Sequence, residues 1–231
     1  MLYPISVPIR DSVEDLTGYI DCAGRTVVKP VFKAGAHFSE GLASVIGDEG
    51  LTGFIDVSGE IAIPFQFRGL DQFHEGLCPI GGRELVGFVD RAGRWQVKPT
   101  FAVAGRFSEG LAKVSTNGTS FGYVDRTGGF IVRPRYEQGG VFSNGLAAAM
   151  EGGMWGYISR DGAVAIPFQF EGPSAQAFTD GLAGVRVGGR WGFIDSLANW
   201  VVMPQFEDIG RFYDGVAPVK KDRKWGLIST L

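Results

Sequence analysis

The chain has 231 residues and a formal net charge of −3 at pH 7. This slightly acidic balance lacks the basic footprint typical of nucleic-acid-binding proteins, so we expect no nucleic-acid partner. Hydrophobic residues make up 45% of the chain and include 18 Phe, which argues against a disordered protein, and no apolar run is long enough to span a membrane.

Residues 1–16 have the pattern of the end of a repeat that recurs throughout the chain. The run Leu2–Ile5 parallels Leu77–Ile80, and a long acidic loop, Arg10–Asp15, follows it. This segment has no cationic start followed by a long apolar run and no lipidation motif, so we predict a cytoplasmic protein without a signal peptide. The two cysteines, Cys22 and Cys78, form no Cys-x-x-Cys pair, which favours a reducing compartment.

Six full repeats of 34 to 36 residues run from about residue 17 to about residue 224. Each repeat begins with a Gly-aromatic-aliphatic triplet, and the last triplet of the chain has Leu in the aromatic place. The triplets start at Gly18, Gly53, Gly87, Gly122, Gly156, Gly192 and Gly226. Residues 225–231 are then the opening strand of a seventh repeat. Because no linker interrupts the period, we predict a single domain, 1–231.

Each repeat is expected to hold three short β-strands and no sizeable helix. The triplet is a short aromatic and β-branched run. An Asp-x-x-Gly turn follows, in which Asp bonds backbone N–H groups two residues on. A second strand, such as Val27–Pro30, is expected to end at Pro, because Pro has no N–H to donate to the hydrogen bonds between inner strands of a sheet. After a crossing loop, Gly-Leu-Ala-x-Val forms the third strand, and a turn leads to the next triplet.

Two aromatic positions accompany every full repeat. The first keeps its place where Pro comes one residue early, at Pro64 and Pro167, so we interpret it as the packing anchor. The anchors are Phe32, Phe67, Phe101, Tyr136, Phe170 and Phe206. The second position is occupied by Phe38, Phe73, Phe107, Phe142, Phe178 and Phe212. We expect these rings and the Trp residues to form repeat core rather than a ligand cage.

The combined pattern resembles the WG (KWG) repeat family of bacterial proteins over nearly the whole chain. The pattern consists of Gly-aromatic-Ile-Asp, Gly, Pro-x-Phe and Phe-x-x-Gly-Leu-Ala. The Trp-Gly pair itself begins at Trp155, Trp191 and Trp225, whereas the first half of the chain is divergent at this place. The resemblance implies a β-repeat architecture and a bacterial source. It transfers no catalytic residue.

Short strands in such meanders cannot bury a face alone and must stack on one another. Two all-β architectures fit this requirement. One is a closed, propeller-like ring of about seven repeats, in which the partial repeats at the two ends combine into one unit and leave no exposed sheet edge. The other is an open β-solenoid or superhelical β-array with terminal caps.

No catalytic, metal-binding or cofactor motif stands out. The Asp residues after the triplets could form a carboxylate ring for a cation, but capping of a tight turn explains each one better. These residues are Asp21, Asp56, Asp90, Asp125 and Asp195. The acidic residues before Gly suit turns as well, and they are Glu40, Glu75, Glu109, Asp180 and Asp214. His37 and His74 lack the spacing of paired metal ligands. We therefore expect no metal, no cofactor and no enzymatic activity.

Positions that differ between repeats are freer to carry recognition than positions that all repeats share. The candidate binding residues on irregular loops are Arg10, Asp11, Glu14, Arg83, Glu84, Asn117, Pro173, Gln176, Arg190, Lys221 and Arg223. The leading hypothesis is a non-enzymatic scaffold that binds another protein through these loops or an exposed face. The alternatives are a protein that neutralises a toxin of the same cell, and a small-ligand or glycan binder with an aromatic-lined pocket.

Overall fold

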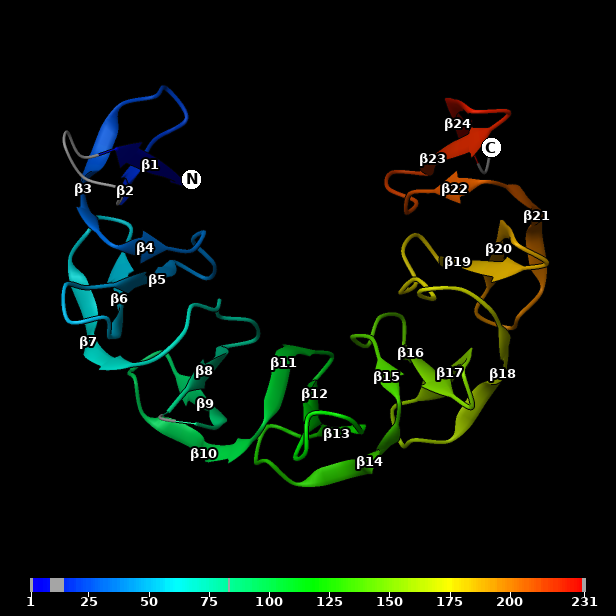
Figure 1. The fold of residues 1–231 in the computed structure, drawn as a ribbon, viewed down its shortest axis with the longest axis horizontal. Coiled ribbons are helices and arrows are strands. Elements are labelled where there is room, and N and C mark those ends of the chain that lie inside the picture. Colours follow the sequence, from blue (N-terminus) through cyan, green and yellow to red (C-terminus); the bar gives the residue numbers. More distant parts are fainter. Residues whose placement is uncertain (1, 9–14, 83, 230–231) are drawn as a thin grey trace. The chain divides into compact units, whose positions relative to one another are not determined.

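The computed structural model describes residues 2–8, 15–82 and 84–229 (Figure 1). These residues form β-strands, turns and loops, as the sequence predicted, and none of them lies in a helix. The described part of the chain thus holds no helix with the length and apolar character of a membrane span. The structure divides into two compact units, Met1–Phe107 and Ser108–Leu231. Whether the chain is a single domain stays a prediction.

The described part of the first unit forms three antiparallel sheets. The first sheet contains β1 (Tyr3–Pro8), β2 (Asp15–Ile20) and β3 (Thr26–Phe32). The second contains β4 (Ala34–Gly35), β5 (Leu42–Ile46), β6 (Thr52–Asp56) and β7 (Ile61–Phe67). The third contains β8 (Leu77–Gly81), β9 (Val86–Asp90) and β10 (Trp95–Phe101). Strand β11 (Val103–Ser108) runs across the boundary between the units.

The second unit repeats this arrangement four times among its described residues. Its first sheet contains β12 (Leu111–Ser115), β13 (Phe121–Val124) and β14 (Phe130–Tyr136). The next contains β15 (Gln138–Gly139), β16 (Leu146–Glu151), β17 (Met154–Ser159) and β18 (Val164–Phe170). Then come β19 (Leu182–Val187), β20 (Arg190–Asp195) and β21 (Trp200–Phe206). The last sheet contains β22 (Asp208–Ile209), β23 (Val216–Lys221) and β24 (Lys224–Ser229).

Each sheet straddles the boundary between two sequence repeats. In the second sheet, Ala43 of the Gly-Leu-Ala strand lies opposite Ile55 of the triplet that follows it. The prediction that one repeat forms one meander is therefore wrong, because the third strand of a repeat pairs with the first strand of the next. The prediction that the partial repeats at the two ends combine into one unit is not met in the sheets of the described residues, because each end pairs with its own neighbour in the chain. Strand β1 pairs with β2, and β24 pairs with β23. Closure into a ring stays a prediction.

Two types of strand recur in the sheets. A triplet strand carries the Gly-aromatic-aliphatic triplet, and the triplet strands are β2, β6, β9, β13, β17, β20 and β24. An outer strand follows a triplet strand in the chain and lies at the edge of its sheet, and the outer strands are β3, β7, β10, β14, β18 and β21. In the described part of the chain, β24 is the one triplet strand without an outer strand.

Proline does not end the outer strands, which corrects the sequence-based expectation. Pro30 lies inside β3, which continues to Phe32. The register shifts around it, because Val28 lies opposite Tyr19 whereas Phe32 lies opposite Thr17. A bulged strand at a sheet edge tolerates a residue that has no backbone N–H. The same register shift occurs in the other outer strands.

The bulge explains why every triplet begins with Gly. A Cβ atom placed on Gly18 would lie 2.6 Å from the carbonyl oxygen of Val28, and one placed on Gly192 would lie 2.5 Å from that of Val202. Real Cβ atoms do not come this close to backbone. The backbone of the outer strand thus lies directly over the glycine, and only glycine leaves room for it.

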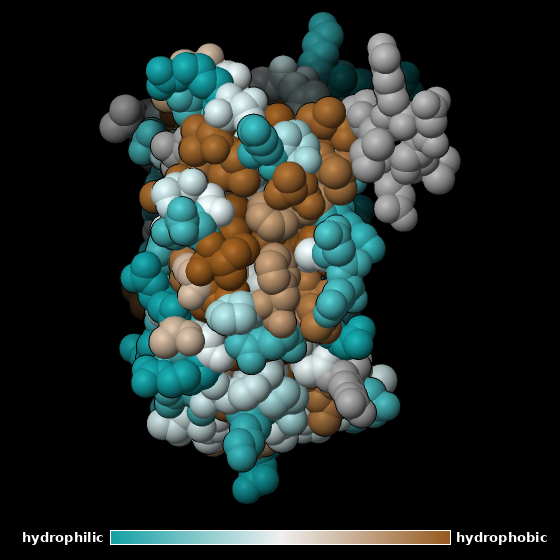
Figure 2. Space-filling view, turned by 90° about the vertical axis from the view of Figure 1, so that its left-hand side faces the viewer, coloured by the Kyte–Doolittle hydropathy of each residue, from teal (hydrophilic) through white to brown (hydrophobic). Residues whose placement is uncertain are grey.

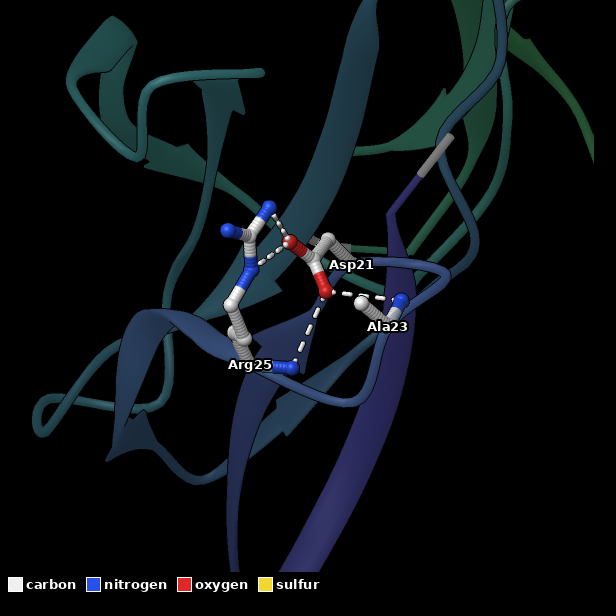
Figure 3. A network of polar contacts seen from close by, with 3 residues as sticks. All are labelled: Asp21, Ala23 and Arg25. Atoms are coloured by element: carbon white, nitrogen blue, oxygen red, sulfur yellow. Dashed lines mark hydrogen bonds and ion pairs between the residues drawn. The ribbon is translucent and has the colours of Figure 1, made fainter.

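The turns after the triplets are capped by Asp, as predicted. Asp21 Oδ1 accepts hydrogen bonds of 2.9 Å from the backbone N–H groups of Ala23 and Arg25, and its other oxygen pairs with the Arg25 guanidinium (Figure 3). Asp56, Asp90, Asp125 and Asp195 accept the same pair of backbone bonds in their own turns. These carboxylates are therefore used by local structure.

The aromatic anchors form the core, which confirms the prediction. All six are buried, with Phe101 at 2% exposure and Tyr136 at 0%. The second set of Phe rings packs against the triplet aromatics, and only Phe38 among them is partly exposed. Phe193 and Phe212, for example, meet edge to face with their centroids 4.8 Å apart. Within a unit, such rings therefore join one sheet to the next and do not form an open cage.

The acidic residues before Gly also tie successive repeats together. Glu40 accepts a hydrogen bond of 2.9 Å from the N–H of Gly76, and Asp180 accepts one of the same length from Gly215. Both residues have positive φ, at 52° and 51°, so they are part of the turns in which they were expected. Their carboxylates bridge residues 35 or 36 apart in the chain.

Candidate functional site

The candidate binding residues lie in different surroundings in the structure. Arg10, Asp11, Glu14 and Arg83 lie outside the described residues. Glu84 is exposed between β8 and β9 of the first unit. The other candidate binding residues that the structure describes lie elsewhere, in the second unit.

Two loop residues of the second unit serve local structure. Asn117 Oδ1 accepts hydrogen bonds of 3.0 and 2.9 Å from the N–H groups of Thr119 and Ser120. The carbonyl of Gln176 accepts a bond of 2.7 Å from the Tyr157 hydroxyl. These contacts give both residues a role in folding. Pro173, in the same loop as Gln176, is exposed.

The structure brings the remaining three, Arg190, Lys221 and Arg223, together at the end of β21. Arg190 Nη1 lies 3.8 Å from Glu207 Oε1, and the backbone N–H of Arg223 donates to the same oxygen at 3.4 Å. Lys221 Nζ donates a bond of 3.0 Å to Gln205 Oε1. Each of these cationic side chains remains exposed. Residues from two hairpins, β19–β20 and β23–β24, therefore form one basic cluster.

Large apolar side chains are exposed on β24, which follows the cluster directly in the chain. Trp225 is 57% exposed and Leu227 is 73% exposed. Trp191 and Phe193 hold the same places on β20, and they are 8% and 1% exposed. The difference arises because β21 and the following sheet, through Ile209, Phe212 and Val219, pack against β20, whereas no described outer strand or further sheet packs against β24. We name the set Arg190, Lys221, Arg223, Trp225 and Leu227 the terminal face.

Sequence reasoning missed the apolar half of the terminal face. It expected Trp225 in the repeat core, and for this residue the expectation is wrong. Trp225 lies on β24, the one triplet strand among the described residues that has no outer strand. A triplet without its outer strand cannot be buried in the way the others are.

The first unit carries a separate apolar hollow of about 490 Å³. Its wall includes Val31, Phe32, Leu51 and Phe65, and the two Phe rings lie 6.4 Å apart. Figure 2 faces the side of this unit where β3 and β7 lie and shows apolar side chains gathered there, with hydrophilic ones around them. Phe32 is only 8% exposed, so its ring lies at the bottom of the hollow and offers little surface of its own.

Asp71, His74 and Cys78 of the first unit lie close enough for their charges to affect one another. Burial raises the pKa of the Asp71 carboxyl and that of the Cys78 thiol. Asp71 lines a small hollow of about 180 Å³ that contains neither histidine nor cysteine in its wall. His37 is exposed, and the main chain of His74 pairs with Leu77. The described residues contain no group of three or more His, Cys, Asp or Glu placed to hold a metal ion.

Comparison with known proteins places the chain among β-repeat proteins. The model of the WG containing repeat matches residues 18–46, 53–80, 87–119, 121–155, 155–191 and 191–225. No curated protein matches the sequence.

Solved structures resemble the chain in fold at low sequence identity. The computationally designed Ika8 protein matches with a TM-score of 0.57 and 12% identity, over 94% of this chain and 77% of that one. BamB from Moraxella catarrhalis matches with a TM-score of 0.57 and 9% identity, over 98% and 78%. Hsv2 from Kluyveromyces lactis matches with a TM-score of 0.56 and 8% identity, over 88% and 83%. These likenesses show the fold alone, an all-β and propeller-like repeat.

Proposed function

The chain belongs to the WG repeat family, and from this premise we propose that it is a non-enzymatic β-repeat scaffold that binds another protein through the terminal face. The observation that carries the proposal is the exposure of Trp225. This indole is 57% exposed, whereas Trp155 and Trp191 in the same place of other sheets are 6% and 8% exposed. A large ring that the fold leaves in water is available to a partner.

The composition of the terminal face fits a protein interface. Trp and Arg are enriched among the residues that dominate binding energy at such interfaces, and an apolar centre with a polar rim is the usual arrangement. Trp225 and Leu227 supply the apolar part, and Arg190, Lys221 and Arg223 supply the charge. The basic rim favours a partner whose contacting surface is acidic.

A pull-down from a lysate of the source organism, followed by mass spectrometry, tests the proposal. The wild-type protein is expected to retain a stoichiometric partner. Trp225→Ala and the double variant Arg190→Glu/Lys221→Glu are each expected to lose it. Two control variants are expected to keep it, Leu197→Ala, which removes another exposed apolar side chain, and Lys98→Glu, which reverses an exposed charge in the first unit. A partner retained by all the variants would contradict the proposal.

A second candidate function rests on the apolar hollow of the first unit. Its volume of about 490 Å³ lies within the range of small-molecule sites, and two aromatic rings line it. Val31→Trp would fill this hollow, whereas Val57→Trp would place the same ring on an exposed turn outside it. A ligand from a panel of aromatic compounds and sugars should raise the melting temperature of the wild type and of Val57→Trp, but not of Val31→Trp. Nothing among the described residues favours the toxin-neutralising alternative.

A further inference from the structure

We propose that the apolar hollow of the first unit binds a small ligand that carries a guanidinium group. The guanidinium stacks on the rings of Phe32 and Phe65, and its charge is balanced by the carboxylates of two further lining residues, Asp48 and Glu49. Aromatic faces and carboxylates are the groups that proteins commonly use to hold a guanidinium. This binding rests on the second candidate function, whose ligand it names, and is independent of the terminal face.

The second unit contains the same pair of rings with a guanidinium already on it. Tyr136 ends β14 as Phe32 ends β3, and Phe168 has the same place in the run Ile-Pro-Phe-Gln-Phe of β18 as Phe65 has in β7. The ring centroids lie 5.9 Å apart in the second unit and 6.4 Å apart in the first. The guanidinium carbon of Arg135 lies 4.7 Å from the centroid of the Tyr136 ring, and its Nη2 donates a hydrogen bond to the Tyr136 hydroxyl.

In the first unit the place of Arg135 is held by Val31, which directly precedes the anchor of β3. Valine is neutral and too short to reach over the neighbouring ring. Val31 is 53% exposed and lines the wall of the hollow. The first unit therefore has the ring pair without the cation that accompanies it in the second, and the space beside the rings is open.

Two glycines hold the Phe65 ring in place. A Cβ atom on Gly47 would lie 3.1 Å from Cε1 of this ring, and one on Gly53 would lie 3.0 Å from its Cδ1, so the ring rests directly on both backbones. Phe168 has the same relation to Gly156, whose Cβ would lie 2.8 Å from the Phe168 Cδ1. The φ of Gly47 is not positive, so the ring accounts for glycine at this position. The aromatic wall is thus preformed, which lowers the entropy that binding costs.

The rim of the hollow carries the charge that attracts a cation. Asp48 and Glu49 are exposed in the loop between β5 and β6, and neither carboxylate has a hydrogen-bond or ion-pair partner among the described residues. The ammonium of Lys33, which follows Phe32, donates a bond of 2.6 Å to the backbone carbonyl of Asp48. Two carboxylates and one ammonium leave this rim with a net negative charge, so it attracts cations and repels anions. Because Phe32 lacks the hydroxyl of Tyr136, the carboxylates are the acceptors for the guanidinium N–H groups.

The test is an NMR titration of the full chain with N-acetyl-L-arginine amide, whose one charge is its guanidinium. We expect saturable shifts of the Phe32 and Phe65 ring signals with a Kd of about 1 mM or below. N-acetyl-L-citrulline amide is the matched neutral compound, because an oxygen replaces one guanidinium nitrogen, and it should bind at least about tenfold more weakly. Higher ionic strength should weaken binding of the arginine compound, because salt screens its attraction to the carboxylates.

Variants of the protein locate the binding in the hollow. Val31→Arg places an arginine where the second unit has Arg135, so it should fill the hollow with its own cation and weaken binding at least about tenfold. Val57→Arg adds the same charge on an exposed turn outside the hollow and should bind like the wild type. The double variant Asp48→Asn/Glu49→Gln removes the charge of the rim at nearly constant shape and should also weaken binding at least about tenfold. Because these side chains are exposed, each variant should remain folded, which thermal unfolding checks.

The outcomes distinguish the guanidinium site from the proposed functions. No binding of the arginine compound, equal binding of the citrulline compound, or equal binding to the wild type and Val31→Arg overturns the site. If a ligand of the compound panel still raises the melting temperature of the wild type and of Val57→Trp but not of Val31→Trp, the hollow binds another class of ligand and the second candidate function stands. The pull-down with Trp225→Ala tests the terminal face separately, because that face lies in the second unit and the hollow in the first.

Discussion

The indole N–H of Trp155 donates a hydrogen bond of 3.1 Å to the carbonyl oxygen of Gly172, two residues beyond the end of β18. This bond fastens the outer strand to the triplet strand at the Trp place. Trp225 holds the corresponding place on β24, where no outer strand lies among the described residues. Two Trp residues in the same sequence context therefore have different environments.

The first prediction compares these two residues. Trp155→Ala removes a ring that is 6% exposed and should lower the free energy of unfolding by about 3–5 kcal/mol. Trp225→Ala removes a ring that is 57% exposed and should lower it by about 0.5 kcal/mol or less. Urea denaturation of both variants measures the difference. Equal losses would mean that Trp225 is buried by a further contact in the folded protein.

The second prediction concerns the anchor position. Phe101→Ala removes a ring that is 2% exposed at the end of β10, and the free energy of unfolding should fall by about 3–5 kcal/mol. Val31→Ala, at a position that is 53% exposed, serves as the control and should cost about 0.5 kcal/mol or less. Denaturant titration measures both values. A loss below about 1 kcal/mol for Phe101→Ala would refute the anchor interpretation.

The third prediction compares two glycines by their effect on stability alone. Gly192→Ala places a methyl group 2.5 Å from the Val202 carbonyl oxygen and 2.8 Å from the Pro204 nitrogen, so β21 must shift. We expect a loss of about 1–3 kcal/mol in the free energy of unfolding. Gly226→Ala should leave this free energy unchanged, because the space around it is open. Thermal or urea unfolding is sufficient, and a stable Gly192→Ala would disprove the close approach of the bulge.

The fourth prediction concerns pH. Three hydrogen bonds to Asp125 lower the pKa of its carboxyl. The largest effect comes from the Thr127 hydroxyl, and the backbone N–H groups of Thr127 and Gly129 lower the pKa further. Because the folded-state pKa is depressed, the stabilisation is complete above the unfolded-state pKa of about 3.9 and is lost as the pH falls through the folded-state value.

Two measurements check this effect. An NMR titration should place the pKa of Asp125 below that of a model peptide. Asp125→Asn should destabilise the protein more at pH 6 than at a pH below the folded-state pKa, since protonation removes the wild-type advantage there. A penalty that does not change with pH, or a pKa at the ordinary value, would be inconsistent with the capped turn.

The sequence allowed prediction of those features that depend on neighbours within one repeat. Two such signals lie within a short stretch of sequence. One is the Asp that caps its own turn, and the other is the anchor aromatic, which keeps its position where Pro comes one residue early. The all-β fold and the buried anchors were therefore correctly predicted. The pairing of Ala43 with Ile55 was not predicted, because a periodic sequence does not show at which strand of the repeat each sheet begins.

The terminal face depends on contacts that no local pattern contains. Trp191-Gly192 and Trp225-Gly226 are identical pairs, and the first is buried by β21 together with the sheet that follows it. Arg190 and Lys221 were correctly singled out as irregular residues. Their gathering with Arg223 around Gln205 and Glu207 could not be predicted, because it depends on how two consecutive sheets stack.

Hydrogen–deuterium exchange of the full chain is the sharpest test of whether β24 presents an uncovered edge and face to a partner. We predict that residues 224–229 exchange much faster than residues 190–195, which lie between two strands, and that a bound partner slows this exchange. Equal protection of the two segments in the free protein would contradict an uncovered β24, because it would mean that this strand is already covered.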